Sequence, residues 1–262
     1  MSEGRLVGKN ALVCGGESGI GAAIVRRFAA EGASVLVGGV QAALLTQLAR
    51  ETGVATTLCD VTDQGAVTRT VDAAAQQPGG LHIVVNAAGI MHADNVADIE
   101  DSVWERLLAV NLSGTMRVCR ASIPHMIRAG GGSVVNIASV AAFNGSAGMA
   151  SYATSKAGLI AFTRALANEY GKDRIRANTL CPGWVRTPMS EAEMAETAQK
   201  TGATVESAFA ALSSRIALGR VARPDEIAAS ALFLASDDSS FVTGASLVAD
   251  GGARAPASSR AQ

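Results

Sequence analysis

Short runs of apolar, β-branched residues alternate with longer helical segments along almost the whole chain, and this alternation constrains the fold more than any other feature. Seven such runs are predicted as strands, among them SVLVG at 34–38 and SVVNIA at 133–138. They are nearly continuous in apolar character, which is typical of strands buried on both faces in a parallel sheet. We therefore predict an α/β chain with a doubly wound, about seven-stranded and mainly parallel sheet covered by helices on both faces.

The predicted elements follow one another with short connections. Strands are expected at 10–15, 34–38, 55–60, 82–86, 133–138, 176–181 and 245–249. Helices are expected at 19–31, 41–51, 63–76, 103–128, 151–170 and 224–235. Residues 1–252 are accordingly predicted as one domain, and 253–262 as a tail that is frayed or packs on a neighbouring subunit. The polar stretch 184–221 predicts a mobile lid over a substrate, with a plain pair of surface helices as the alternative.

The composition limits the classes of partner. Of 262 residues, 48% are hydrophobic and 17% charged, and the formal net charge is −1. This balance gives no electrostatic basis for binding nucleic acid or an anionic membrane, and no apolar run approaches the ~18 residues of a spanning helix. The N-terminal segment lacks the apolar core of a signal peptide, so a cytoplasmic protein is expected. The four cysteines and three histidines are scattered along the chain, so no metal site is predicted.

A glycine-rich turn follows the first predicted strand. Gly15, Gly19 and Gly21 in the segment CGGESGIG let the backbone come close to a ligand, and the next helix presents free N–H groups to an anion. The segment lacks the Gly-Lys-Ser/Thr ending of a Walker phosphate loop. The turn therefore predicts a site for the pyrophosphate of a dinucleotide.

Polar residues also stand where four later strands are predicted to end. Asp60, Asn86 and Ser139 each follow an apolar run, and the segment CPGWVRTP at 181–188 follows the sixth strand. Ligands of open parallel sheets bind beyond the carboxyl ends of the strands. One shared crevice is therefore predicted, although each residue alone could simply cap a turn.

Tyr152 and Lys156 lie four residues apart in a stretch of small and aliphatic residues, and the chain has only two tyrosines and four lysines. This spacing places both side chains on one face of a helix. A tyrosine pKa is about 10, and a neighbouring ammonium is expected to lower it. The pair therefore predicts an acid–base centre. Asn111 interrupts the apolar stretch LLAVNL, where a buried amide needs a hydrogen-bond partner.

Taken together, these residues resemble the short-chain dehydrogenase/reductases. The resemblance covers nearly the whole chain. It rests on the glycine turn, the pair Asp60–Val61, NAAG at 86–89, Asn111, Ser139 with Tyr152 and Lys156, PG at 182–183 and DGG at 250–252. The resemblance implies a single-domain Rossmann fold, a nicotinamide cofactor and commonly a homotetramer.

The resemblance also implies a role for individual residues. Tyr152 would be the general acid/base, Lys156 would hold the nicotinamide ribose, Ser139 would bind the substrate oxygen, and Asn111 would anchor a water in a proton relay. Cofactor contacts are expected at Gly15, Glu17, Ser18, Gly19, Ile20, Gly21, Gly39, Val40, Asp60, Val61, Asn86, Ala87, Ala88, Gly89, Tyr152, Lys156, Pro182, Gly183, Val185 and Thr187.

The chain departs from the family pattern at two places. Cys14 stands where the glycine turn usually begins with Thr, and a thiol is the weaker hydrogen-bonding group. Gly39 and Val40 stand where users of NAD typically carry Asp and users of NADP a basic residue nearby. Glu17 in the turn should repel a 2′-phosphate, so NAD is the expected cofactor, with NADP as the alternative.

The substrate is predicted from residues near the expected crevice. An uncharged, fairly hydrophobic secondary alcohol or ketone is expected, lined by Met91, His92, Phe143, Asn144, Met149, Trp184 and Met189, unless these are ordinary core residues. The main rival within the enzymes is NADPH-dependent reduction of a 3-oxoacyl thioester, with Arg128, Arg174 and Arg176 meeting an acidic carrier protein. A non-catalytic dinucleotide sensor or interaction module is the alternative of another class, and it needs only some of the four residues Asn111, Ser139, Tyr152 and Lys156.

Overall fold

The computed structural model describes residues 4–253, and seven parallel strands form the centre of the molecule. Their order across the sheet is β3-β2-β1-β4-β5-β6-β7. The strands are β1 Asn10–Cys14, β2 Ser34–Gly39, β3 Ala55–Leu58, β4 Ile83–Asn86, β5 Gly132–Ile137, β6 Ile175–Pro182 and β7 Ser246–Ala249. The chain order reverses between β1 and β4, which is where a doubly wound sheet opens a crevice at its carboxyl edge. Of the predicted tail, 254–262 lie outside the described residues.

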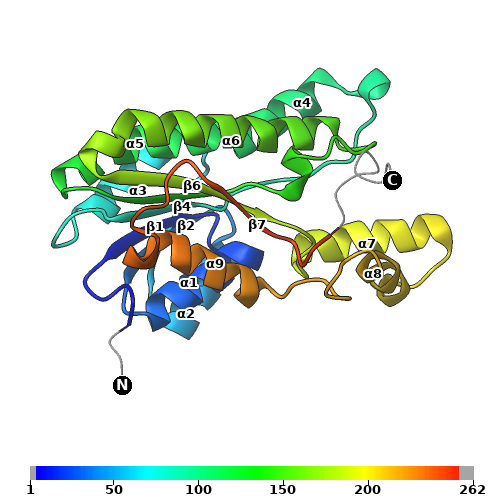
Figure 1. Cartoon of the computed structure of the whole chain (residues 1–262), viewed down its shortest axis with the longest axis horizontal. Helices are drawn as coiled ribbons and strands as arrows, with labels where there is room; N and C mark the ends of the chain where they lie inside the picture. Colours follow the sequence, from blue (N-terminus) through cyan, green and yellow to red (C-terminus); the bar gives the residue numbers. More distant parts are fainter. Residues whose placement is uncertain (1–3, 254–262) are drawn as a thin grey trace.

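Helices cover both faces of the sheet, as predicted (Figure 1). On one side lie α1 Gly19–Ala30, α2 Ala42–Thr52 and α9 Pro224–Ala235; on the other lie α3 Gln64–Ala75, α4 Asp101–Leu108, α5 Thr115–Arg128 and α6 Ala150–Tyr170. Alternate residues of β1 supply the two cores, since Ala11 and Val13 belong to one buried cluster and Leu12 and Cys14 to the other. The predicted fold class, an α/β doubly wound parallel sheet, is confirmed.

The single helix predicted at 103–128 is divided by a wider turn. The segment Ala109–Gly114 between α4 and α5 is π-helical. A Cβ atom on Gly114 would lie 2.6 Å from Cγ2 of Val61, so this turn packs tightly against the loop that follows β3. Asn111 sits within the π turn, and single π turns inside helices are frequent at functional sites.

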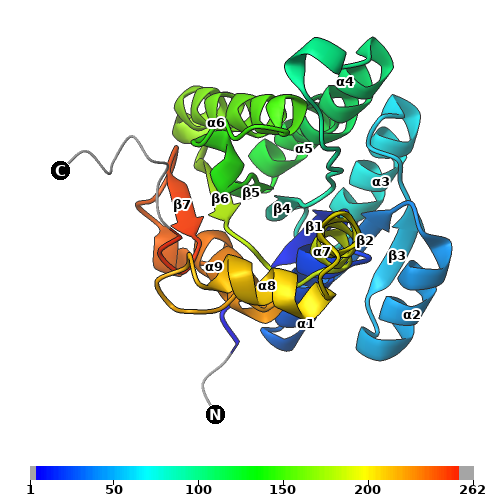
Figure 2. The ribbon, with the colours of Figure 1, turned by 90° about the vertical axis from the view of Figure 1, so that its right-hand side faces the viewer.

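The stretch 184–221 contains two helices, α7 Pro188–Thr201 and α8 Val205–Ser213. They lie beyond the carboxyl ends of the strands, away from the other helices (Figures 1 and 2). The stretch leaves and returns at one point, where Arg186 N donates to Ala222 O and Ala222 N donates to Trp184 O, both at 2.9 Å. A narrow base of this kind is compatible with the predicted lid.

The arginines suggested for an acidic carrier protein lie elsewhere. Arg174 precedes β6 and Arg176 is near its start, at the edge of the sheet opposite the strand ends. The guanidinium of Arg176 donates to Leu234 O at 2.9 Å and Ser236 O at 3.0 Å, at the end of α9. Arg176 therefore caps a helix and is not available to a partner, which corrects that part of the prediction.

The close approach of the glycine turn to the next strand end gives a testable prediction. Gly15 and Gly53 share a left-handed φ of 75°, yet a Cβ atom on Gly15 would lie 2.3 Å from Ala88 N, whereas nothing lies within 4 Å at Gly53. Gly53→Ala should therefore cost about 1 kcal/mol of unfolding free energy from backbone strain alone. Gly15→Ala should cost about 3 kcal/mol or more, because backbone must move. Urea unfolding of both variants measures the difference, and equal losses would contradict this packing.

Candidate active site

Buried amides join β4, β5 and α6 beneath the carboxyl ends of the strands. Asn86 and Asn136 are paired across β4 and β5. Asn86 Nδ2 donates to Asn136 Oδ1, and Asn136 Nδ2 donates to Thr163 Oγ1 on α6, both at 2.8 Å. Because an unpaired amide is costly in an apolar interior, this chain of bonds fixes how α6 lies on the sheet.

A second contact fixes the first turn of α6. The carboxylate of buried Asp94 accepts from Ser151 N at 3.3 and 3.4 Å, and Asp94 N donates to Gly148 O at 3.0 Å. A carboxylate is favourable at a helix N-terminus because it faces free N–H groups. Asp94 thereby positions Tyr152, one residue further on. The sequence gives no local signal for this role, since Asp94 is 57 residues from Ser151.

Ser139, Tyr152 and Lys156 meet at the ends of β5 and α6, as expected from their positions. Lys156 Nζ lies 5.7 Å from the centroid of the Tyr152 ring and donates to Ile137 O at 2.9 Å. The side chain of Ser139 lies next to that of Tyr152 and accepts from Ala141 N at 3.1 Å. One hydroxyl, one phenol and one ammonium thus share a small region at the sheet edge.

The electrostatics of this group differ from the expectation. Burial raises the pKa of Tyr152 above its usual value; the neighbouring hydroxyl of Ser139 lowers it, and the carboxylate of Glu193 raises it. Burial also lowers the pKa of Lys156 to about 8. The predicted lowering of the Tyr152 pKa by Lys156 is therefore wrong for the protein alone. The same burial that brings the two groups together disfavours both charged forms.

Asn111 has more partners than the sequence predicted. Its Nδ2 donates to Ile90 O at 2.9 Å and to Ser155 Oγ at 3.0 Å, and its Oδ1 accepts from Ile90 N at 2.8 Å. Both amide hydrogens are thus used, so a water could reach the side chain only by donating to Oδ1. The observed function of Asn111 is to clamp the backbone that follows the NAAG segment. The water-anchoring role stays a prediction.

The predicted cofactor motifs come together at the sheet edge. Gly15 N donates to Gly38 O at 2.7 Å, and the same glycine lies against Ala88 of the NAAG segment. A Cβ atom on Gly19 would lie 3.4 Å from the side chain of Thr187, so the loop after β6 approaches the turn from the other side. The glycine turn, the NAAG segment and the β6 loop therefore border one place.

The start of α1 suits an anion. A Cβ atom on Gly21 would lie 2.0 Å from Gly15 O, so only glycine allows the helix to begin this close to the turn. Ser18 precedes α1, and its side chain makes no capping hydrogen bond. Ser18, Gly19 and Ile20 therefore present a helix N-terminus without a side-chain cap toward the predicted pyrophosphate site.

The remaining cofactor candidates lie along the same edge. Asp60 Oδ1 accepts from Thr62 N at 2.8 Å and from Thr62 Oγ1 at 2.7 Å, and these bonds hold the pKa of Asp60 below its usual value. A Cβ atom on Gly89 would lie 3.3 Å from Lys156 Nζ, so this glycine leaves the ammonium uncovered. The others are found after or at strand ends: Gly39, Val40, Val61, Ala87, Pro182, Gly183 and Val185.

Cys14 replaces the usual Thr without loosening the turn. Its thiol is buried beside that of Cys59, whose pKa it lowers to about 7. The neighbouring Cys59 thiol and burial raise the pKa of Cys14. Backbone bonds, above all that from Gly15 to Gly38, hold the turn instead.

The substrate candidates are partly exposed around the same opening. Phe143 and Met189 are 49% and 45% exposed, His92 is exposed, and the half-buried ones are Met91, Asn144, Met149 and Trp184. The sequence did not indicate Glu193. This half-buried carboxylate of α7 acts on Tyr152 from across the opening, and burial raises its own pKa. Its position depends on how α7 lies over the sheet, which no local pattern encodes.

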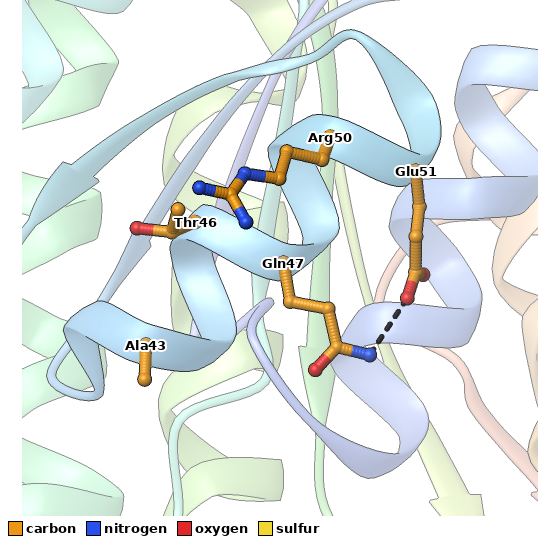
Figure 3. A pocket seen from close by; sticks show the side chains of 5 residues that line it. All are labelled: Ala43, Thr46, Gln47, Arg50 and Glu51. Atoms are coloured by element: carbon orange, nitrogen blue, oxygen red, sulfur yellow. Dashed lines mark hydrogen bonds between the residues drawn. The ribbon is translucent and has the colours of Figure 1, made fainter.

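The structure has two surface hollows, one on α2 and one beside the glycine turn. One, of about 570 Å³, is on α2 and is lined by Ala43, Thr46, Gln47, Arg50 and Glu51 (Figure 3). It contains none of the predicted site residues. The other, of about 190 Å³, adjoins the turn and is lined by Glu17, Ser18, Gly19, Ala22, Arg26, Leu44, Gln47, Leu48 and Pro188.

The described part of the chain contains neither a cluster of metal-ligating side chains nor a membrane-spanning helix. Between residues 4 and 253, no three His, Cys, Asp or Glu side chains are grouped so that they could hold a metal ion. Over the same residues, no helix combines the length and apolar character required to span a membrane.

Comparisons with known proteins agree with this geometry. The family model described as Enoyl-(Acyl carrier protein) reductase matches residues 15–254. The chain is 38% identical to a 3-oxoacyl-[acyl-carrier-protein] reductase of Thermotoga maritima, over 95% of this chain and 98% of that protein. It is 39% identical to a 3-alpha-(or 20-beta)-hydroxysteroid dehydrogenase of Mycobacterium bovis, over 95% and 90% of the two chains.

A solved structure shares the whole architecture. The aldohexose dehydrogenase of Thermoplasma acidophilum superimposes with a TM-score of 0.89 at 31% identity, covering 97% of this chain and 98% of that one. The sequence motifs, the fold and these matches over nearly the full length lead to one conclusion: the chain belongs to the short-chain dehydrogenase/reductase family of oxidoreductases.

Proposed function

We propose that the protein interconverts a secondary alcohol and a ketone, using NAD, with Tyr152 as general acid/base. The observation that carries the proposal is the meeting of Ser139, Tyr152 and Lys156 beside the glycine turn, at the carboxyl edge of the sheet. A bound nicotinamide would supply the hydride chemistry. A sensor that only binds dinucleotide needs no such convergence of proton-transferring groups.

Proton transfer in this proposal is carried out by Tyr152, with Ser139 and Lys156 beside it. The hydroxyl groups of Ser139 and Tyr152 lie close together, so a substrate oxygen that reaches them would meet both. In alcohol oxidation, Tyr152 Oη takes the hydroxyl proton, and in ketone reduction it returns one. Lys156, with a pKa of about 8, is mostly protonated at neutral pH, and its charge favours the phenolate as it forms. We also propose that Lys156 holds the nicotinamide ribose.

NAD is the proposed cofactor because the glycine turn carries an acid and not a base. Glu17 lies beside the end of β2, where its Oε1 accepts from Val40 N at 2.8 Å. A 2′-phosphate near this carboxylate would meet like charge. NADP is therefore the disfavoured alternative.

For the substrate we propose an uncharged, fairly hydrophobic molecule contacting Met91, Phe143, Asn144, Met149, Trp184 and Met189 beneath a lid formed by 184–221. The two relatives named above act on a 3-oxoacyl thioester and on a steroid, respectively. Reduction of a 3-oxoacyl thioester with NADPH is thus the rival function, and the first relative favours it. Steady-state assays of both substrate classes with both cofactors separate the two.

Removing the phenol tests the catalytic role. Tyr152→Phe should lower turnover about 10³-fold or more, since general acid–base catalysis contributes of this order, and should leave the affinity for NADH largely intact. The assay follows nicotinamide absorbance with a panel of secondary alcohols. The matched control is Tyr170→Phe, which alters the other tyrosine of the chain at the far end of α6. Retained turnover in Tyr152→Phe would contradict the assignment.

The burial of the Lys156 ammonium is expected to lower the unfolding free energy while serving activity. Below pH 8, Lys156 is charged in both the folded and unfolded chain, and the folded state carries the cost of its burial. As pH rises above 8, the folded chain releases this proton before the unfolded chain does, so the cost is relieved. Lys156→Met should therefore raise the unfolding free energy at pH 7 by about 1–2 kcal/mol.

The gain from Lys156→Met should shrink above pH 8 while activity is lost at every pH. Urea unfolding at pH 7 and pH 9.5 measures the gain. Lys172→Met, which changes an exposed lysine, serves as the control and should be neutral. A less stable Lys156→Met protein at pH 7 would show that the ammonium stabilises the fold.

A homotetramer is also proposed, and the sheet edge supports it. Phe241 is fully exposed, and Val248 on the edge strand β7 is 46% exposed. Such apolar groups beside an edge strand mark an interaction surface. Light scattering should give four chains of 26.5 kDa for the parent protein and half that mass for Phe241→Asp. Val96→Asp, at an exposed site on another element, should keep the parent mass. A monomeric parent protein would refute the tetramer.

A further inference from the structure

A carboxylate from another part of the chain, that of Glu17, lies at the end of β2. Val40 N donates to Glu17 Oε1 at 2.8 Å, although the two residues are 23 positions apart. A Cβ atom on Gly39 would lie 2.2 Å from Glu17 Oε2, 2.3 Å from its Cδ and 2.6 Å from its Oε1. The carboxylate of Glu17 therefore fills the space that a side chain of residue 39 would occupy.

This carboxylate has an unused hydrogen-bonding capacity. Glu17 is only 8% exposed, and its Oε2 is buried without a hydrogen-bond partner in the described part of the chain. A buried charged oxygen without a donor is costly, so its persistence calls for a function. The residue lies in the glycine turn, directly before Ser18 and the start of α1, and therefore next to the proposed pyrophosphate site.

We propose that Glu17 binds the vicinal hydroxyls of the adenosine ribose and so selects NAD over its 2′-phosphorylated form. In dinucleotide-binding folds an acid near the end of the second strand accepts from the ribose hydroxyls. Here the acid reaches that place from the glycine turn, and glycine at position 39 is the condition for it. A 2′-phosphate would remove one hydroxyl donor and bring like charge to the same carboxylate.

The charges around this place agree with the proposal. The cation in the adjoining hollow is Arg26, and its guanidinium is bound to Glu51 at 2.6 Å. Arg26 is thus paired with Glu51 of α2 and not with Glu17. The proposal rests on the nicotinamide cofactor proposed above, and it adds the residue that binds the adenosine ribose and distinguishes NAD from NADP.

Binding measurements test the proposal without a substrate. Dissociation constants of NADH and NADPH are measured by nicotinamide fluorescence for the parent protein, Glu17→Gln and Glu169→Gln. The last variant removes the same charge at an exposed site near the end of α6. The parent protein should bind NADH at least about tenfold more tightly than NADPH, and Glu17→Gln should reduce this ratio by about tenfold or more, as expected for a hydrogen bond to a charged group. Glu169→Gln should keep the parent ratio.

An exchange of positions tests whether Gly39 and Glu17 act as one unit. Gly39→Asp alone should weaken the binding of both cofactors, because its side chain collides with Glu17 and adds a second negative charge. The double variant Glu17→Ser/Gly39→Asp should recover the NADH affinity and the preference for NADH, because the carboxylate is again present at the same place. Thermal unfolding shows whether each variant is folded before binding is measured.

The outcomes separate this inference from the proposed function. A parent protein that prefers NADH and a Glu17→Gln variant with the same ratio would overturn the role of Glu17 but leave the NAD-dependent enzyme intact. Tighter binding of NADPH by the parent protein would overturn both the role of Glu17 and the choice of NAD. Binding of neither cofactor would remove the proposed function, and the inference with it.

Discussion

The packing of α6 on the carboxyl ends of β4 and β5 is the constraint on which the rest of the site depends. The bonds from Asn86 to Asn136 and from Asn136 to Thr163 are buried, so any shift of α6 would leave amides unpaired. Asp94 fixes the first turn of the same helix. With its first turn and its middle held in this way, α6 places Tyr152 and Lys156 in one position relative to Ser139. Polar bonds within the core thus set the geometry of the proposed catalytic group.

The same burial sets the electrostatic character of the centre. Burial raises the pKa of Tyr152 and lowers that of Lys156, so it disfavours the charged form of each group. A proton can then move at low cost only when a ligand supplies compensating charge or hydrogen bonds. The positive charge of an oxidised nicotinamide and the oxygen of a substrate are groups of this kind. Proton transfer by Tyr152 would accordingly require both the cofactor and the substrate to be bound.

Much of the fold follows from local sequence because its causes are local. Apolar runs bounded by glycine and polar residues locate the strands, and the spacing of Tyr152 and Lys156 needs only helical geometry. The π turn around Asn111 packs against Val61, which is remote in sequence. The capping by Asp94 and the approach of Glu193 depend on how loops and α7 fold over the sheet. Contacts between residues that are remote in sequence cannot be predicted from patterns of neighbouring residues.

At the end of β2, the residue that supplies a group is not the residue at the expected position. In the sequence, Gly39 and Val40 carry neither acid nor base, so the usual residue that distinguishes NAD from NADP is missing. In the structure a carboxylate is nevertheless present there, because Glu17 occupies the volume that Gly39 leaves free and accepts a hydrogen bond from Val40 N. A ribose responds to the charge and the hydrogen-bond acceptors that it meets, and not to the strand that delivers them. The absence of a side chain at residue 39 therefore belongs to the proposed site, since it makes room for Glu17, which comes from the turn that is also proposed to bind the pyrophosphate.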